Sequence, residues 1–122
     1  ETMLIFYDLL RPGGLLLVGM RDFEPLLEDR PRFVPGRVHD EPEEQVITFD
    51  IWDWDDGPPV TVTYNRFIVR GSGESYRVSR HPVRFRALTA AEVEVVMSEV
   101  GFVDIRSQRD RWELVMTAAK PE

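Results

Sequence analysis

The chain has 122 residues, enough for one domain with a hydrophobic core, and 43% hydrophobic residues are typical of a globular protein. Acidic residues outnumber basic ones by 22 to 15, and the resulting net charge of -7 argues against a general nucleic-acid-binding function. Without cysteine there is no disulfide framework, thiolate metal site or cysteine nucleophile. No apolar run is long enough to span a membrane and no signal peptide is visible, so we expect a soluble, cytoplasmic protein.

A helix, a turn and a strand are predicted for the first 21 residues. Apolar residues from Met3 to Leu10 follow the i, i+3, i+4, i+7 spacing of one helical face, which predicts a helix over 3–11. Pro12 cannot continue that helix, and a glycine after it can adopt the positive φ that ends one. The unbroken apolar run that follows predicts a strand over 14–21, covered on both faces as in a parallel α/β sheet.

The middle of the chain is predicted to be mainly antiparallel strands. A short helix over Phe23–Asp29 precedes a Pro-rich, acidic stretch over 30–44, which is typical of a loop. Segments rich in β-branched and aromatic residues follow at 45–54, 60–70 and 76–87, separated by turn clusters. Short turns between consecutive strands predict an antiparallel meander.

A helix and a hairpin are predicted for the C-terminal part. Thr89 and Glu92 have the spacing of a capping box, in which each side chain binds the backbone N–H of the other, and Gly101 ends the helix. Two strands, over 102–107 and 112–118, flank a polar turn.

This order of elements resembles the C-terminal half of a class I S-adenosylmethionine (SAM)-dependent methyltransferase. In that fold the sheet has seven strands, and the last two form a hairpin. Leu10–Met20, an LRPGG turn before an apolar strand, is similar to the turn and fifth strand; Thr89–Phe102 is similar to the last helix and the start of the sixth strand, and Trp112–Ala118 to the seventh strand. The resemblance implies an α/β fold: a partial Rossmann-like methyltransferase sheet of strands five to seven, a three-stranded antiparallel insert over 44–87, and no N-terminal cofactor half. Residues 1–122 would then form a single partial domain.

Two further observations agree with missing sequence. The chain starts without an initiator methionine, and the strand over 14–21 has no evident parallel partner, so we expect a piece of a longer protein. The Gly-rich turn that holds the cofactor in this fold follows a strand and precedes a helix, whereas Gly71–Gly73 lies in a predicted hairpin. The resemblance therefore implies SAM as the cofactor, bound mainly by the missing N-terminal half, with no cofactor-binding residue in this chain.

The chain is also similar to the glycine and glycine/sarcosine N-methyltransferase group. In that group an Arg just after the fifth strand, followed by a polar residue and an aromatic one, holds the substrate carboxylate, and Arg21 and Phe23 match this pattern. The run Tyr76–Pro82 is similar to the end of the group's insert, but Arg80 and His81 stand where the glycine enzyme has tyrosines. The resemblance implies a substrate-binding role for Arg21 and Phe23, whereas the departure at Arg80 and His81 leaves the acceptor unidentified.

Each of these side chains also has a purely structural interpretation. Arg21 either clamps a carboxylate through two hydrogen bonds or pairs with Asp22 or Glu24 at the surface. His81 is the candidate catalytic residue, as a general base or a hydrogen-bond donor, and the alternative is a half-exposed strand histidine. Arg80, next to it, is assigned to substrate binding.

The aromatic and charged residues of the middle segment leave similar choices. Trp52 and Tyr64 either line a substrate pocket or belong to the core. The aspartates over 50–56 alternate along a strand, which predicts a solvated acidic edge and no calcium loop; with His39 expected at the surface, no metal site is predicted. We expect the six arginines over 66–86 to pair with that acidic strand and not to bind nucleic acid.

Two functions are compatible with these observations. The first is the substrate-side portion of a SAM-dependent methyltransferase that acts on a small molecule at nitrogen or oxygen. As part of a longer chain this would be an enzyme, whereas the segment alone would be inactive and would self-associate through exposed sheet edges. The alternative is a non-catalytic α+β binding module whose antiparallel sheet holds a small apolar ligand.

Overall fold

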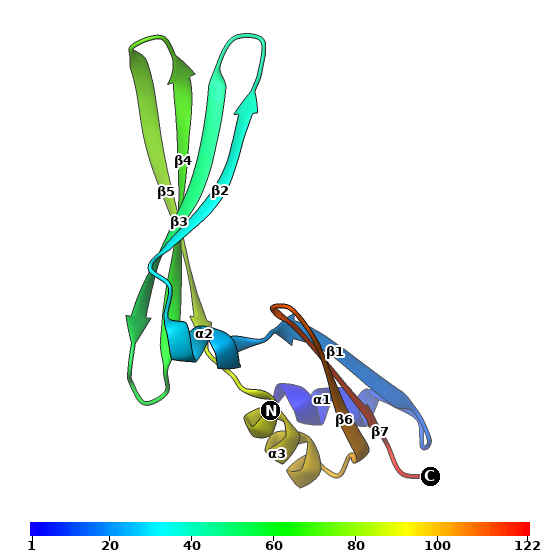
Figure 1. Cartoon of the computed structure of the whole chain (residues 1–122). Helices are drawn as coiled ribbons and strands as arrows, with labels where there is room; N and C mark the ends of the chain where they lie inside the picture. The colour runs from blue at the N-terminus through cyan, green and yellow to red at the C-terminus, as the bar shows by residue number, and fades with distance from the viewer. The chain divides into compact units, whose positions relative to one another are not determined.

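The computed structural model describes residues 1–122 and divides into two compact units, each with its own sheet (Figure 1). Unit 1 comprises residues 1–28 and 88–122, and unit 2 comprises residues 29–87. No helix in the structure combines the length and the apolar character needed to cross a membrane. The elements in chain order are α1 (Thr2–Leu9), β1 (Leu15–Arg21), α2 (Phe23–Asp29), β2 (Phe33–Asp40), β3 (Gln45–Asp55), β4 (Thr61–Ser72), β5 (Ser75–Arg86), α3 (Ala90–Val100), β6 (Val103–Asp110) and β7 (Glu113–Ala119).

Strand β7 is the central strand of the sheet in unit 1. It pairs antiparallel with β1, from Leu15 opposite Ala119 to Arg21 opposite Glu113, and antiparallel with β6 on its other side. The order β1-β7-β6 confirms the predicted terminal hairpin. It also confirms that β1 has no parallel neighbour in this chain, because its only partner is β7.

The core of unit 1 lies on one face of this sheet, against α1 and α3. Leu114, Met116 and Ala118 of β7 are only 0–2% exposed and form one apolar cluster with Val93 and Met97 of α3. Alternate residues of β7 point into this cluster, as the two-residue repeat of a strand requires. The buried face of β7 therefore holds the two helices to the sheet.

Strand β1 is not covered on both faces, and that prediction is wrong. Leu16, Val18 and Met20 contact the core, whereas Leu15 and Leu17 are 77% and 69% exposed. The helices of unit 1 cover only the face to which the first set points. An unbroken apolar run has no alternation that would reveal on how many faces a strand is covered.

Helix α1 lies on the core through its predicted face, and Met3, Tyr7 and Leu10 contact the buried cluster. The helix ends at Leu9, earlier than predicted: Leu10 is extended, with φ -83° and ψ 140°, and the positive φ of 79° falls on Gly13 in the turn beyond. Lys120 donates hydrogen bonds of 2.9 Å to the carbonyl oxygens of Tyr7 and Leu10. A cation here satisfies carbonyls that a helix end leaves without partners.

Helix α3 has both of its predicted ends. The Thr89 hydroxyl accepts a hydrogen bond of 3.3 Å from the Glu92 backbone N–H, and the Glu92 carboxylate accepts one of 3.3 Å from the Thr89 backbone N–H. Gly101 has a φ of 119°, and its N–H donates to the Met97 carbonyl. The capping box and the glycine end are thus confirmed.

Unit 2 is a four-stranded antiparallel sheet in the order β2-β3-β4-β5. The three predicted strands are confirmed, but a loop throughout 30–44 is wrong, since β2 occupies Phe33–Asp40 and adds a fourth strand. Pro35 is compatible with this because β2 is an edge strand, and the register with β3 shifts between Pro35 and Val38. Gly73, with a φ of 58°, lies in the β4–β5 hairpin, as predicted for Gly71–Gly73.

The capping box gives a test of this fold. Replacing Thr89 with Ala removes the acceptor for the Glu92 N–H, and we expect the free energy of unfolding to fall by about 1 kcal/mol. Urea denaturation followed by circular dichroism measures this change. Ser98→Ala, at an exposed site on α3, is the matched control and should leave stability unchanged or slightly higher. Equal stability of the two variants would contradict the role of the cap.

Candidate functional site

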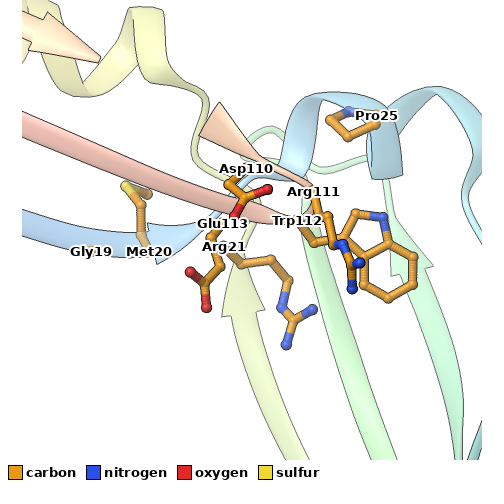
Figure 2. A pocket seen from close by; sticks show the side chains of 8 residues that line it. All are labelled: Gly19, Met20, Arg21, Pro25, Asp110, Arg111, Trp112 and Glu113. Atoms are coloured by element: carbon orange, nitrogen blue, oxygen red, sulfur yellow. The ribbon is translucent and has the colours of Figure 1, made fainter. Parts of the chain in front are cut away.

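An open concavity of about 1280 Å³ lies at the carboxyl end of β1 in unit 1. Figure 2 shows the residues that line it. Arg21, the last residue of β1, is one of its lining residues, in agreement with its predicted position at a strand end. The other side is formed by the two-residue turn between β6 and β7. The lining residues are Gly19, Met20, Arg21, Pro25, Asp110, Arg111, Trp112 and Glu113.

Backbone pairing fixes the turn residues relative to Arg21. Arg21 lies opposite Glu113 in the β1–β7 ladder, and the Asp22 N–H donates a 2.7 Å hydrogen bond to the Trp112 carbonyl. Arg111 adopts a φ of 56°, a left-handed conformation that non-glycine residues rarely take. The turn therefore presents Arg111 and Trp112 beside the end of β1, and Trp112 remains 48% exposed.

A charged network lies next to this concavity. Arg109 Nη1 is 3.0 Å from the carboxylate of Asp22 and 2.8 Å from that of Glu24. Asp22 is only 2% exposed, and its carboxylate also accepts a hydrogen bond of 3.3 Å from the Glu24 N–H in the first turn of α2. The network ties the start of α2 to β6. Arg109 therefore pairs with both Asp22 and Glu24.

Hydrogen bonding within this network shifts two pKa values. The hydrogen bond from Arg109, supported by its positive charge, lowers the pKa of Glu24 although partial desolvation opposes the shift. The same hydrogen bond to Glu24, together with the charges of both carboxylates, raises the pKa of Arg109. Arg109 therefore remains a cation, and Glu24 remains an anion to lower pH than an isolated glutamate.

The concavity combines groups of both charges with an aromatic surface. The guanidinium groups of Arg21 and Arg111 can donate paired hydrogen bonds to carboxylate or phosphate oxygens. The carboxylates of Asp110 and Glu113 can accept hydrogen bonds from hydroxyl or ammonium groups, and Trp112 offers a flat apolar contact. This set of groups suits a small polar molecule. Phe23, the other predicted binding residue in unit 1, is 5% exposed and lies outside the lining.

A second hollow, of about 380 Å³, lies on one face of the sheet in unit 2. It brings together two predicted site residues, His81 and Tyr64, because β4 lies between β3 and β5. Asp50, Arg66 and His81 form one row across the three strands. The remaining lining residues are Ile68, Val83 and Phe85. We refer to this hollow as the sheet groove.

The other two predicted residues of unit 2 contact neighbouring side chains of the sheet. Trp52 is 1% exposed, and its ring stacks on that of Tyr64 with a centroid distance of 4.0 Å and an interplanar angle of 5°. Arg80 donates hydrogen bonds of 2.9 and 2.6 Å to the Asn65 side-chain oxygen. Because consecutive strand residues point to opposite faces, Arg80 faces away from His81 and does not line the sheet groove.

The arginines over 66–86 agree only in part with the expectation that they pair with the acidic strand. Arg66 pairs with Asp50 of that strand at 2.7 Å, whereas Arg80 and Arg84 donate hydrogen bonds to uncharged side chains. Arg70 and Arg77 both bind Glu44, which lies just before that segment. No three histidine or carboxylate side chains come together as ligands of a metal ion.

Four site residues were missed from the sequence. Arg111 and Trp112 were assigned to a polar turn and a strand. Asp50 and Arg66 were expected only as members of an acidic strand and of the arginines that pair with it, and not as parts of a site. The only signal for them is the register of strand pairs, which places Asp50 opposite Arg66 and the β6–β7 turn beside Arg21. That register becomes visible only when the strands are assembled.

The chain contains no turn suited to a SAM adenosine or methionine group. The motif requires glycines between a strand and the helix that follows. The two strand-to-helix connections, β1 to α2 and β5 to α3, contain only Asp22 and residues 87–89, and no glycine. The residues present therefore do not form the cofactor cradle of this fold.

The Arg109 network gives a test of the local structure. Arg109→Met leaves the buried Asp22 carboxylate without its cation, and we expect the free energy of unfolding to fall measurably at neutral pH. Because the pKa of Glu24 is lowered in the folded state, its ion pair stabilises the wild type above the ordinary glutamate pKa. That stabilisation is lost as the pH falls through the lowered value.

Urea denaturation at stepwise lower pH measures both effects. The wild type should lose the stabilisation from the Glu24–Arg109 ion pair in acid. Arg109→Met lacks this ion pair, so its stability should not show that loss. Arg106→Met, at an exposed arginine of β6, is the control. An identical pH dependence of stability in all three proteins would contradict the network.

Comparison with known proteins supports the fold. No protein-family model and no curated protein sequence matches the chain. Among solved structures it is similar to CalS10, an amino pentose methyltransferase from Micromonospora echinaspora, with a TM-score of 0.70 and 15% identity over 97% of this chain and 48% of the other. The sugar N-methyltransferase KedS8 from Streptoalloteichus matches with a TM-score of 0.69 and 10% identity, over 98% of this chain and 47% of the other. A SAM-dependent methyltransferase from Clostridium acetobutylicum matches with a TM-score of 0.65 and 12% identity, over 98% of this chain and 50% of the other.

At such low identity these similarities establish the fold and not the activity. The chain spans about half the length of each of these methyltransferases. Strands β6 and β7 form the antiparallel hairpin that the resemblance implies for strands six and seven. The chain therefore has the α/β fold of the C-terminal half of SAM-dependent methyltransferases.

Proposed function

We propose that this chain forms the acceptor side of a SAM-dependent methyltransferase that acts on a small molecule. One observation carries the proposal: 97% of the chain superimposes on about half of CalS10 with a TM-score of 0.70. The concavity at the carboxyl end of β1 supports it, because ligands of open α/β sheets bind beyond the carboxyl ends of the strands. SAM would be held mainly by residues outside this chain, since neither strand-to-helix connection contains a glycine.

The acceptor is proposed to be an amine or alcohol that also carries an anionic group. Arg21 would bind that group through charge-assisted hydrogen bonds, and Asp110 or Glu113 would accept hydrogen bonds from its polar substituents. Methyl transfer depends largely on holding the two reactants in line, so a clamp of this kind contributes directly to the rate. A likeness to the glycine and sarcosine enzymes favours an amino acid, whereas CalS10 and KedS8 are described as acting on an amino pentose and a sugar.

We propose that His81 acts as the sequence predicts, as a general base or a hydrogen-bond donor to substrate. Methylation of an amine or a hydroxyl leaves a proton to be removed, and a neutral imidazole can accept it near neutral pH. The exposure of His81 and its position in the sheet groove support this assignment. Its only hydrogen-bonding neighbour is the Ser79 hydroxyl at 3.2 Å, which leaves the other ring nitrogen available.

The proposal predicts SAM-dependent methylation by the polypeptide that the intact gene encodes. Transfer of a labelled methyl group to a panel of amino sugars, sugars and amino acids measures the activity. Arg21→Ala should raise the acceptor KM by about tenfold or more, because charge-assisted hydrogen bonds contribute about 1.5–3 kcal/mol, and should leave the SAM KM unchanged. Arg106→Ala, at an exposed arginine outside the concavity, is the control.

Three results would contradict parts of this proposal. Absence of methyl transfer to every acceptor would refute the proposed activity. An unchanged acceptor KM in Arg21→Ala would refute the proposed binding role of Arg21 and leave the proposed activity intact. Micromolar binding of SAM to residues 1–122 in a calorimetric titration would show that the cofactor site lies within this chain.

We further propose that residues 1–122, produced alone, self-associate through β1. Leu15 and Leu17 are largely exposed, and the outer edge of β1 has no partner strand. Exposed apolar strand edges pair with other chains.

Sedimentation velocity tests this self-association. Leu15→Lys/Leu17→Lys should shift the sample toward monomer, because lysine on an edge strand opposes strand pairing. Leu9→Lys, at an 80% exposed position on α1, is the matched control and should not change the mass. A wild-type chain that remains monomeric at high concentration would refute the proposal.

A further inference from the structure

We propose that the sheet groove of unit 2 binds a small planar carboxylate, such as an aromatic acid. This inference goes beyond the proposed function, because it concerns binding alone and holds whether or not the chain takes part in methyl transfer. It rests on three features of the groove: a guanidinium held in place by a buried carboxylate, flanking apolar side chains, and the absence of any other acid in the lining.

The first feature is the fixed position of Arg66. The Asp50 carboxylate, on a residue that is 6% exposed, accepts hydrogen bonds of 2.7 Å from Arg66 Nε and 3.3 Å from Arg66 Nη2. Asp50 also accepts one of 3.3 Å from Trp52 Nε1. These contacts orient the guanidinium before any ligand arrives, which reduces the ordering that binding requires.

Arg66 retains binding capacity after this pairing. Its Nη1 group makes no hydrogen bond within the chain, and the side chain is 59% exposed. Hydrogen bonding to Asp50 raises the pKa of Arg66, so the group is a permanent cation. A carboxylate can therefore receive hydrogen bonds from the outer edge of the same guanidinium that Asp50 holds on the inner edge.

The second feature is the apolar surface beside this cation. Ile68, Val83 and Phe85 line the groove with Tyr64, and Val83 and Phe85 are 53% and 40% exposed. The Tyr64 ring packs on Phe85 with a centroid distance of 4.7 Å and on Trp52 beneath it, so it is held as a rigid surface. A flat ring that covers these side chains removes apolar surface from water.

The third feature is charge. Asp50 is the only carboxylate among the lining residues, and Arg66 already neutralises it. His81, in the same row as Arg66, adds a hydrogen-bond donor or a positive charge according to its protonation. A bound anion would therefore not face an unpaired carboxylate in the groove. The volume of about 380 Å³ falls within the range of small-molecule sites.

Direct binding to residues 1–122, without SAM, tests the inference. We choose 2-naphthoate as the probe and 2-naphthalenemethanol as its neutral analogue, and measure amide chemical shifts by NMR. The expected result is saturable binding of 2-naphthoate with a dissociation constant below about 1 mM, at least tenfold tighter than that of the alcohol. The shifts should centre on Tyr64, Ile68 and Phe85. Equal affinity for the two probes, or shifts outside the groove, would overturn the inference.

Paired variants separate recognition from folding. Arg66→Gln alone would leave the Asp50 carboxylate without its guanidinium, so it is combined with Asp50→Asn, which preserves net charge and approximate shape. This double variant should bind 2-naphthoate no more tightly than the alcohol. Arg77→Gln removes an arginine of the same sheet outside the groove and should bind both probes as the wild type does. Unchanged 2-naphthoate affinity in the folded double variant would refute the role of Arg66.

Discussion

The pairing of β7 with both β1 and β6 is the constraint on which the structure of unit 1 depends. β1 is near the start of the chain and β7 is at its end, yet they form a continuous ladder of seven residue pairs. That ladder places Leu114, Met116 and Ala118 under α3, and it places Arg21 opposite Glu113. Long-range pairing of this kind requires closing a large loop, so the gain from the buried cluster must offset the entropy of closure.

The same ladder determines the candidate acceptor site. Its last pair lies at the open end of the sheet, where the β6–β7 turn contributes Arg111 and Trp112. The hydrogen bond from Asp22 to Trp112 and the ion pair from Arg109 to Asp22 continue the connection beyond the last strand pair. Residues that line the candidate site are thus held by neighbours outside the lining, which is a common requirement for precise binding.

In unit 2 the equivalent constraint is the position of β4 between β3 and β5. Residues 61–71 of β4 have a neighbour on both sides, so three-residue rows cross the sheet, such as Asp50, Arg66 and His81. In this row Asp50 and Arg66 form an ion pair, and the exposed imidazole of His81 lies next to Arg66. The neighbouring row, with Trp52 and Tyr64, becomes an aromatic stack. Polar and apolar rows therefore lie next to each other, and this combination forms the sheet groove.

Local signals predicted well wherever neighbouring residues decide the conformation. Thr89, Glu92 and Gly101 interact within one helix, and both helix ends were correctly predicted from their spacing. The prediction failed where distant contacts decide. The β2 strand forms because it can pair with β3 despite Pro35, and Leu15 is exposed because no element of this chain covers that face of β1. Helix α1 ends earlier than predicted because Leu10 is extended, and Lys120 donates a hydrogen bond to the Leu10 carbonyl at this end.

The sequence by itself determined the order of helices and strands, the likeness to the C-terminal half of a methyltransferase, and the position of Arg21 at a strand end. Only the tertiary structure decided which side chains meet. It assigned Asp22 to Arg109, placed Arg111 and Trp112 beside Arg21, and separated Arg80 from His81 across the sheet. The physical reason is that strand side chains alternate between faces, so a shift of one residue in register reverses every contact. Register is a property of paired strands, and a single strand does not contain it.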